Sequence, residues 1–118
     1  KRQISQLTLG MKNLMGVIGG NRGRLHHNIA ESLSDIASVI HSDLTVVDAT
    51  RILTANGPQG GRLQDVRDLD TLIASPDVVA ADAYATTLFG LSPEQVPTVV
   101  AAARRGLGVR DLKQVRMV

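Results

Sequence analysis

The chain has 118 residues, a net charge of +2 and no cysteine, and 43% of its residues are hydrophobic. This length fits one domain or a piece of a larger one, with enough apolar residues for a core. The lack of cysteine excludes disulfides, thiolate catalysis and cysteine-held metals or clusters within these residues. Aromatic residues make up only 2%, and no apolar run approaches membrane-spanning length. We therefore expect neither a nucleic-acid partner nor a membrane span.

The first half of the chain alternates short apolar runs with one helical stripe. Residues 15–18 form an apolar run closed by glycines, which predicts a buried strand. Apolar residues in steps of three and four predict a helix over about 24–41. The run 44–47 is β-branched and apolar, which predicts a buried strand ending at Asp48.

The middle of the chain contains an irregular segment. Residues 51–54 fit either a second strand or a helical turn, and residues 56 to about 68 predict a loop. Residues 71–74 then predict a short apolar strand. Asp77 has the position of an N-cap for a helix over 78–89, which ends before Gly90.

The last third begins with a clear helix signal. Ser92, Pro93 and Gln95 form a capping-box pattern, which predicts a helix ending at Gly106. Residues 115–118 predict a final strand. Helices between short apolar strands favour an α/β layered fold with a short, largely buried, mixed or parallel sheet and about three main helices, all in a single domain over 1–118.

Asp82 is the most informative single residue for a site. The predicted helix around it is apolar on almost every face, which predicts that the helix is buried. A buried carboxylate needs a partner, because an unpaired charge there is costly. Asp82 is therefore either a metal ligand or acid/base, or it is held structurally by Arg51, Arg62 or backbone amides. We favour the structural alternative.

Asp48 stands at the expected carboxyl end of a strand. In α/β folds with parallel strands, that edge is where ligands bind. The alternative is an aspartate that bonds its own following backbone. If Asp48 and Asp82 met in one cleft, their oxygens would suit Mg²⁺, Ca²⁺ or Mn²⁺ better than zinc.

The loop from Asn56 to Gly61 is rich in glycine and offers backbone N–H groups without side-chain bulk. Such a loop can cradle an anion, with Asn56, Gly57, Gly60 and Gly61 as the candidate residues. It lacks the Lys-Ser/Thr ending of a P-loop and the flanking elements of a dinucleotide-binding fingerprint. Its composition alone favours a structural turn.

Four further polar residues are candidates near the basic start of the chain. His26 and His27 are adjacent, so on a helix they point about 100° apart and rarely share a metal. Either could act as an acid/base, although a surface histidine is the simpler interpretation. Lys12 and Asn13, close in sequence to Arg22 and Arg24, could bind a carboxylate or phosphate.

Several of these segments occur together in one known family. The matching segments, in order, are 12–16, a histidine at 26 or 27, 43–49, 56–61, 75–82 and 106–108. In this order the chain resembles the C-terminal half of the domain-of-unknown-function family 362, whose members are often described as iron–sulfur cluster-binding proteins. One departure is that Pro76 precedes Asp77, where the family favours Asp followed by Pro.

The resemblance implies a longer parent protein with a missing N-terminal half of the domain. It also implies a ferredoxin-like segment with a 4Fe-4S cluster elsewhere in the parent, and in some relatives a twin-arginine export signal. Localisation is therefore open between cytoplasmic and exported. The family's polar positions fall here on Lys12, Asn13, Asp48, Asn56 and Asp82, with His26 or His27.

Two functions follow as expectations. In the first, the chain contributes half of an anion- or divalent-metal-binding site to a redox protein of the iron–sulfur family. In the second, it is a non-catalytic module that docks the cluster-bearing segment. The enclosure of Asp82 discriminates between them: a shared open cleft with Asp48 favours the first, and full satisfaction by backbone donors favours the second.

Overall fold

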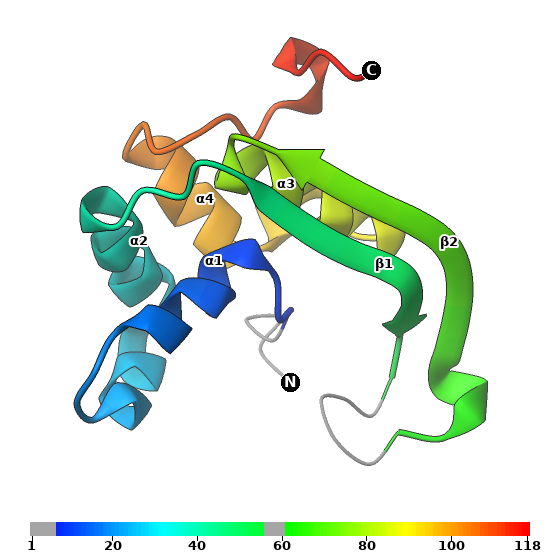
Figure 1. The fold of residues 1–118 in the computed structure, drawn as a ribbon, viewed down its shortest axis with the longest axis horizontal. Coiled ribbons are helices and arrows are strands. Elements are labelled where there is room, and N and C mark those ends of the chain that lie inside the picture. The colour runs from blue at the N-terminus through cyan, green and yellow to red at the C-terminus, as the bar shows by residue number, and fades with distance from the viewer. Residues whose placement is uncertain (1–6, 56–60) are drawn as a thin grey trace.

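The computed structural model describes residues 7–55 and 61–118. Within these ranges the chain combines four α-helices with a two-stranded sheet (Figure 1), so the expected α/β class is confirmed. Three of the helices have eight or more residues, which roughly matches the expected number. The elements are α1 (Gly10–Asn13), α2 (Ile29–Val39), β1 (Thr45–Leu53), β2 (Val66–Ser75), α3 (Val78–Leu88) and α4 (Pro97–Arg104), joined by short 3-10 turns.

The sheet is antiparallel, and the expectation of a parallel or mixed sheet was wrong. Thr45 pairs with Ser75 at one end and Leu53 with Val66 at the other. Both strands are longer than the sequence indicated. Within the described residues between them there is a 3-10 turn, Leu63–Asp65, but no α-helix. Without a helical crossover the chain simply reverses direction, which gives a hairpin.

The hairpin contains one bulge. Its register changes by one residue between Ala49 and Arg51, and β2 holds the extra residue. Asp70, in the bulged part of β2, has φ of 49°. Aspartate tolerates this left-handed conformation better than most residues, and a left-handed residue is typical of bulges. Figure 1 shows that the hairpin is bent, and a bulge bends the strand that contains it.

The first part of the chain is more helical than expected. Residues 15–18 do not form a strand, because Leu14–Val17 is a 3-10 turn that continues α1. A four-residue apolar run cannot distinguish a strand from a helical turn. The expected helix over 24–41 is divided into a 3-10 segment, Arg22–Asn28, and α2, because the backbone at Asn28 is not helical (φ −145°, ψ 67°).

The expected helix from Ser92 to Gly106 is interrupted. The capping box is present, with the Ser92 N–H donating to Gln95 Oε1 at 2.8 Å, but it closes only a 3-10 turn. Val96 is extended because it precedes Pro97, and a proline disfavours the helical conformation of the residue before it. Helix α4 therefore begins at Pro97. Residues 115–118 are not a strand.

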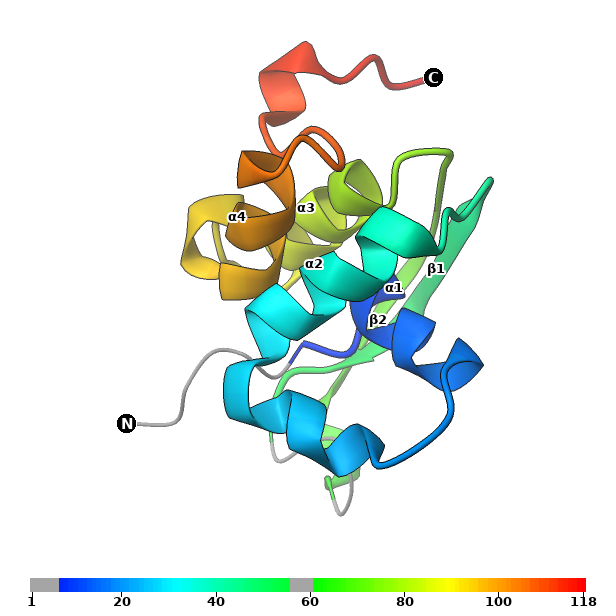
Figure 2. The same cartoon turned by 90° about the vertical axis from the view of Figure 1, so that its left-hand side faces the viewer.

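The core lies where α3 packs between the hairpin and the other helices. Helix α3 contacts both strands on one side and α4 on the other. Figure 2 shows α2, α3 and α4 gathered on one side of the hairpin. The core residues are Met11, Leu33, Val79, Ala83, Val96, Val99 and Ala102. On the surface, Arg105 binds Glu31 and Asp35, which joins the end of α4 to α2.

Candidate functional site

Asp82 occupies the middle of α3, the most deeply buried helix. Seven of its eleven residues are buried, because small alanines allow close approach from several directions. The residue Asp82 is only 2% exposed. The sequence-based expectation of a buried helix around this carboxylate is therefore confirmed.

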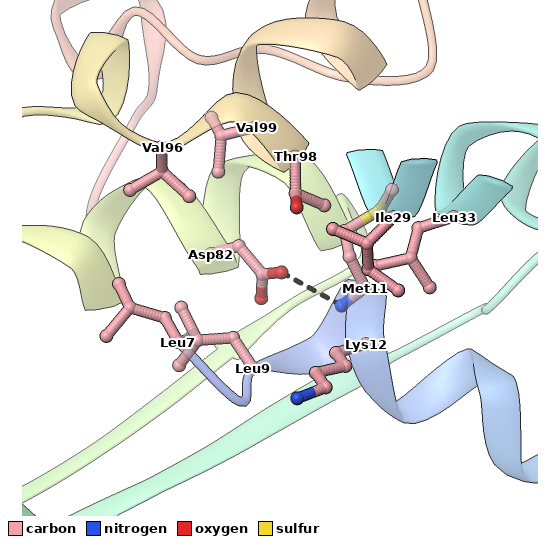
Figure 3. A pocket seen from close by; sticks show the side chains of 10 residues that line it. All are labelled: Leu7, Leu9, Met11, Lys12, Ile29, Leu33, Asp82, Val96, Thr98 and Val99. Carbon is pink, nitrogen blue, oxygen red and sulfur yellow. Dashed lines mark hydrogen bonds between the residues drawn. The ribbon is translucent and has the colours of Figure 1, made fainter. Parts of the chain in front are cut away.

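Both carboxylate oxygens of Asp82 accept backbone hydrogen bonds from the start of α1. Gly10 donates to Oδ1 and Met11 donates to Oδ2, each at 2.8 Å. Figure 3 shows the carboxylate directed at Met11 within a ring of apolar side chains. The first N–H groups of a helix have no partner inside the helix, and the residue before α1, Leu9, offers no side-chain acceptor. Asp82 supplies that acceptor from a different helix.

Burial raises the pKa of Asp82 to about 6, and the hydrogen bonds from Met11 and Gly10 oppose part of this rise. Desolvation penalises the charged form, whereas amide donors stabilise it. Within residues 7–55 and 61–118 no salt bridge joins Asp82 to Lys12, Arg51 or Arg62. Of the structural partners considered from the sequence, the observed ones are backbone amides.

The cavity beside Asp82 has a volume of about 10 Å³, which is room for about one water molecule. Its wall is mostly apolar, as Figure 3 shows, and Lys12 and Thr98 are its other polar side chains. A substrate or cofactor needs a pocket of several hundred Å³. In this conformation the Asp82 environment is therefore a packed junction between helices.

Gly10 allows this junction to form. A β-carbon at this position would lie 2.7 Å from Thr45 Cγ2, 3.0 Å from Asp82 Oδ1 and 3.1 Å from Val78 Cγ2. Only a glycine lets the first turn of α1 approach both β1 and α3 so closely. No sequence signal identifies Gly10, because nothing in its flanking residues reveals a contact 72 positions away.

Asp48 lies in a different environment. It sits within β1, five residues before the strand ends, and not at a carboxyl edge as expected. Its exposed carboxylate accepts the Thr50 N–H at 3.0 Å and the Thr50 hydroxyl at 2.8 Å, both on Oδ1. These bonds hold the pKa of Asp48 below its ordinary value. Asp48 does not line the cavity beside Asp82.

The other candidates are distributed over the surface near the start of the chain. Lys12 is half-buried and lines the Asp82 cavity, whereas Asn13, the next residue, is exposed. His26 and His27 are both exposed and belong to the 3-10 segment before α2. Neither histidine lines the cavity, so Lys12 is the one of these four that lines the same cavity as Asp82.

The glycine-rich loop is described only at its end. Asn56, Gly57 and Gly60 lie outside the described residues, and Gly61 is exposed. Asp65 closes the described part of the loop. It accepts the Arg62 N–H on Oδ2 at 2.8 Å, and its carbonyl accepts the Thr54 N–H at 2.8 Å.

Asp77 has a second role that the sequence did not indicate. As expected for an N-cap, its Oδ1 accepts the Ala80 N–H at 2.9 Å. Its Oδ2 also accepts the Val109 N–H at 2.9 Å, which ties the segment after α4 to the start of α3. A β-carbon on Gly108 would lie 2.7 Å from the Val79 β-carbon, so this segment passes unusually close to α3.

Within the described ranges no group of three or more His, Asp or Glu side chains is placed to hold a metal ion. In the same ranges no helix is long and apolar enough to cross a membrane. What the geometry defines is a small α/β unit organised around a buried carboxylate.

The chain belongs to the family described as domain of unknown function 362 (DUF362), whose model matches residues 2–87. This membership confirms the family that the sequence motifs indicated. A curated relative, a thylakoid-associated protein of Synechocystis, is 35% identical over 109 residues. That alignment covers 86% of this chain but 33% of the relative, so the chain spans about a third of its length. No solved structure matches the chain.

Proposed function

We propose that this domain is a non-catalytic docking module within a longer redox protein of the iron–sulfur type. The enclosure of Asp82 is the observation that supports this proposal, because it indicates a structural role for this buried carboxylate. Its two oxygens accept two backbone amides, and its cavity has room for about one water molecule. A group that binds substrate or metal needs open coordination positions and space beside it.

The cluster itself would be held elsewhere in the parent protein. This chain has no cysteine, and cysteine thiolates hold most clusters of the 4Fe-4S kind. In the proposed arrangement, a ferredoxin-like segment of the parent supplies the thiolates. The present domain positions that segment for electron transfer.

Metal and cluster analysis of the full-length parent tests this function. We expect Asp82→Asn to leave iron, sulfide and divalent-metal content unchanged per molecule of folded protein, while stability falls. Asp82→Ala should also increase proteolytic cleavage of a cluster-bearing segment, because the module that docks it is loosened. Loss of metal from Asp82→Asn with unchanged unfolding would instead identify Asp82 as a ligand and refute the structural role.

A half-site for an anion or a divalent cation is a second candidate, and the exposure of Asp48 is the observation that favours it. Asp48 is solvent-accessible and its pKa lies below the ordinary value, so it is charged at neutral pH. Residues of the parent, together with Asn56 of the glycine loop, would complete the site. Titration of the parent with Mn²⁺, followed by electron paramagnetic resonance, tests this candidate. One bound Mn²⁺ should be lost in Asp48→Asn and retained in Asp82→Asn.

A further inference from the structure

Part of the hairpin face that points away from the helices is apolar, although a solvent-exposed strand face is usually polar. Side chains alternate along the strands, so Thr45, Val47 and Ala49 face the helices. Val46, which points the other way, is 60% exposed, and Leu72 on β2 is 67% exposed.

These outward residues form one continuous patch. Val46 pairs with Ala74 and Asp48 pairs with Leu72, so Val46 and Leu72 are diagonal neighbours on one face. Leu44, just before β1, is 60% exposed. We call the set Leu44, Val46, Leu72 and Ala74 the outward patch. Only Asp48 interrupts it.

The patch ends where the hairpin bends. Beyond the bulge the strands place charged residues at the surface, among them Arg51, Arg67 and Asp68. Charged residues on a strand are a normal protection against unwanted pairing. In the half of the hairpin next to α3, Asp48 is the one charged residue of the two paired strands, which favours a defined contact surface.

The sequence pattern of β1 agrees with a covered patch. The run 44–47 is apolar at nearly every position, whereas a strand with one solvent-exposed face alternates between apolar and polar residues. A continuous apolar run is typical of a strand buried on both faces. Within the described residues only one face is covered, by α3 and α1.

The sheet is also small for an independent unit. It has two strands within the described residues, and the packing of α3 and α1 against one face supports them while the other face has no such cover there. The chain covers 33% of the Synechocystis relative, so about two thirds of that relative has no counterpart in these residues. In a parent as long as that relative, a large amount of polypeptide would be available to complete the sheet.

We propose that the outward patch is a docking surface, and that its occupant is the remainder of the parent chain. The surface deepens the proposed docking function, on which it rests, by stating where the module binds. The remainder would place apolar side chains over Val46 and Leu72. Burial of these two side chains would then contribute to the stability of the whole parent protein.

Cysteine accessibility in the full-length parent tests the surface. This chain has no cysteine, so Val46→Cys and Leu72→Cys each introduce one new thiol into it. Val39→Cys is the matched control, because Val39 is 84% exposed at the end of α2. Peptide mass spectrometry measures the alkylation rate at each introduced thiol. The rate in the folded parent is divided by the rate at the same thiol in the parent unfolded in urea.

We expect alkylation at positions 46 and 72 to be at least ten-fold slower than at 39 in the folded parent. Equal rates at the three positions would overturn the proposal. Protection that disappears when the parent is diluted to a monomer would overturn it as well, because the occupant would then be a second copy. Hydroxyl-radical footprinting of native Val46, Leu72 and Val39 gives the same comparison without any substitution.

This outcome is separable from that of the proposed function. A freely accessible patch together with unchanged metal content in Asp82→Asn refutes the surface and leaves docking through another face. A protected patch together with metal loss in Asp82→Asn refutes the non-catalytic role of Asp82 and retains the surface.

Discussion

Asp82 on α3 accepts a 2.8 Å hydrogen bond from the backbone N–H of Met11, which lies 71 residues earlier in the chain. This bond and its neighbour from Gly10 connect the beginning of the described chain to its central helix. The connection replaces a local N-cap, because Leu9 cannot accept a hydrogen bond with its side chain. A helix only four residues long therefore depends on a distant carboxylate.

The first prediction concerns removal of one acceptor. In Asp82→Asn a single carbonyl oxygen remains, so one of the two amides loses its partner. An unsatisfied buried donor costs about 1–3 kcal/mol, and we expect the free energy of unfolding at pH 4, where Asp82 is protonated in the folded protein, to fall by that amount. Asp82→Ala should cost more, because both amides lose their acceptor. Urea denaturation measures the difference.

Asp48→Asn is the control for this change. Asp48 is exposed, and asparagine retains the oxygen that accepts the Thr50 bonds. We expect its unfolding curve to match that of the unsubstituted protein. If the two aspartate variants lose the same stability, the loss comes from a general charge effect and the amide bonds of Asp82 are not its cause.

The second prediction is a pH dependence with a definite sign. The folded protein holds the Asp82 proton up to about pH 6, above the ordinary value of 3.8. The contribution of this group is therefore fully present below the unfolded pKa and is lost as the pH rises through about 6. The difference between the two values corresponds to roughly 3 kcal/mol.

The free energy of unfolding is measured from pH 4 to pH 7 in the unsubstituted protein and in Asp82→Asn. The difference between the two proteins isolates the contribution of Asp82. The unsubstituted protein should lose stability relative to the variant as the pH rises. Asp48 has a lowered pKa, so its contribution has the opposite sign and is lost only at more acidic pH. A constant difference between the two proteins would show that the Asp82 pKa is not raised.

Much of the site's setting was predictable from the sequence, but its contacts were not. The apolar residues around Asp82 predicted enclosure, and the patterns at Asp77 and Ser92 predicted caps that the structure contains. The Asp82 oxygens accept hydrogen bonds from the backbone amides of Gly10 and Met11. Almost every residue has such an amide, so no sequence signal identifies these two donors. Strand direction depends on which segments pair at long range, and local patterns do not specify this.

The third prediction tests the close approach at Gly10. A methyl group there would lie 2.7 Å from Thr45 Cγ2, against both β1 and α3. Overpacking of this kind costs about 1–3 kcal/mol, so we expect Gly10→Ala to lower the free energy of unfolding by that much. Gly16→Ala is the matched control, because a methyl group there meets no atom within 4 Å. Equal stability of the two variants would contradict a packed junction at Gly10.

The fourth prediction separates the two bonds of Asp77. One oxygen caps α3 through Ala80, and the other holds Val109 in the segment after α4. Asparagine is as good an N-cap as aspartate, so Asp77→Asn should keep the cap and release Val109. Asp77→Ala loses both bonds and should cost about 1–2 kcal/mol.

Hydrogen exchange of individual amides distinguishes the two variants. In Asp77→Asn we expect faster exchange at Val109 with little change at Ala80, whereas in Asp77→Ala both amides should exchange faster. Asp111→Ala is the control, because Asp111 caps only the short turn Leu112–Gln114 through the Lys113 N–H. If Val109 exchanges at the same rate in all three variants, Asp77 does not hold this segment against α3.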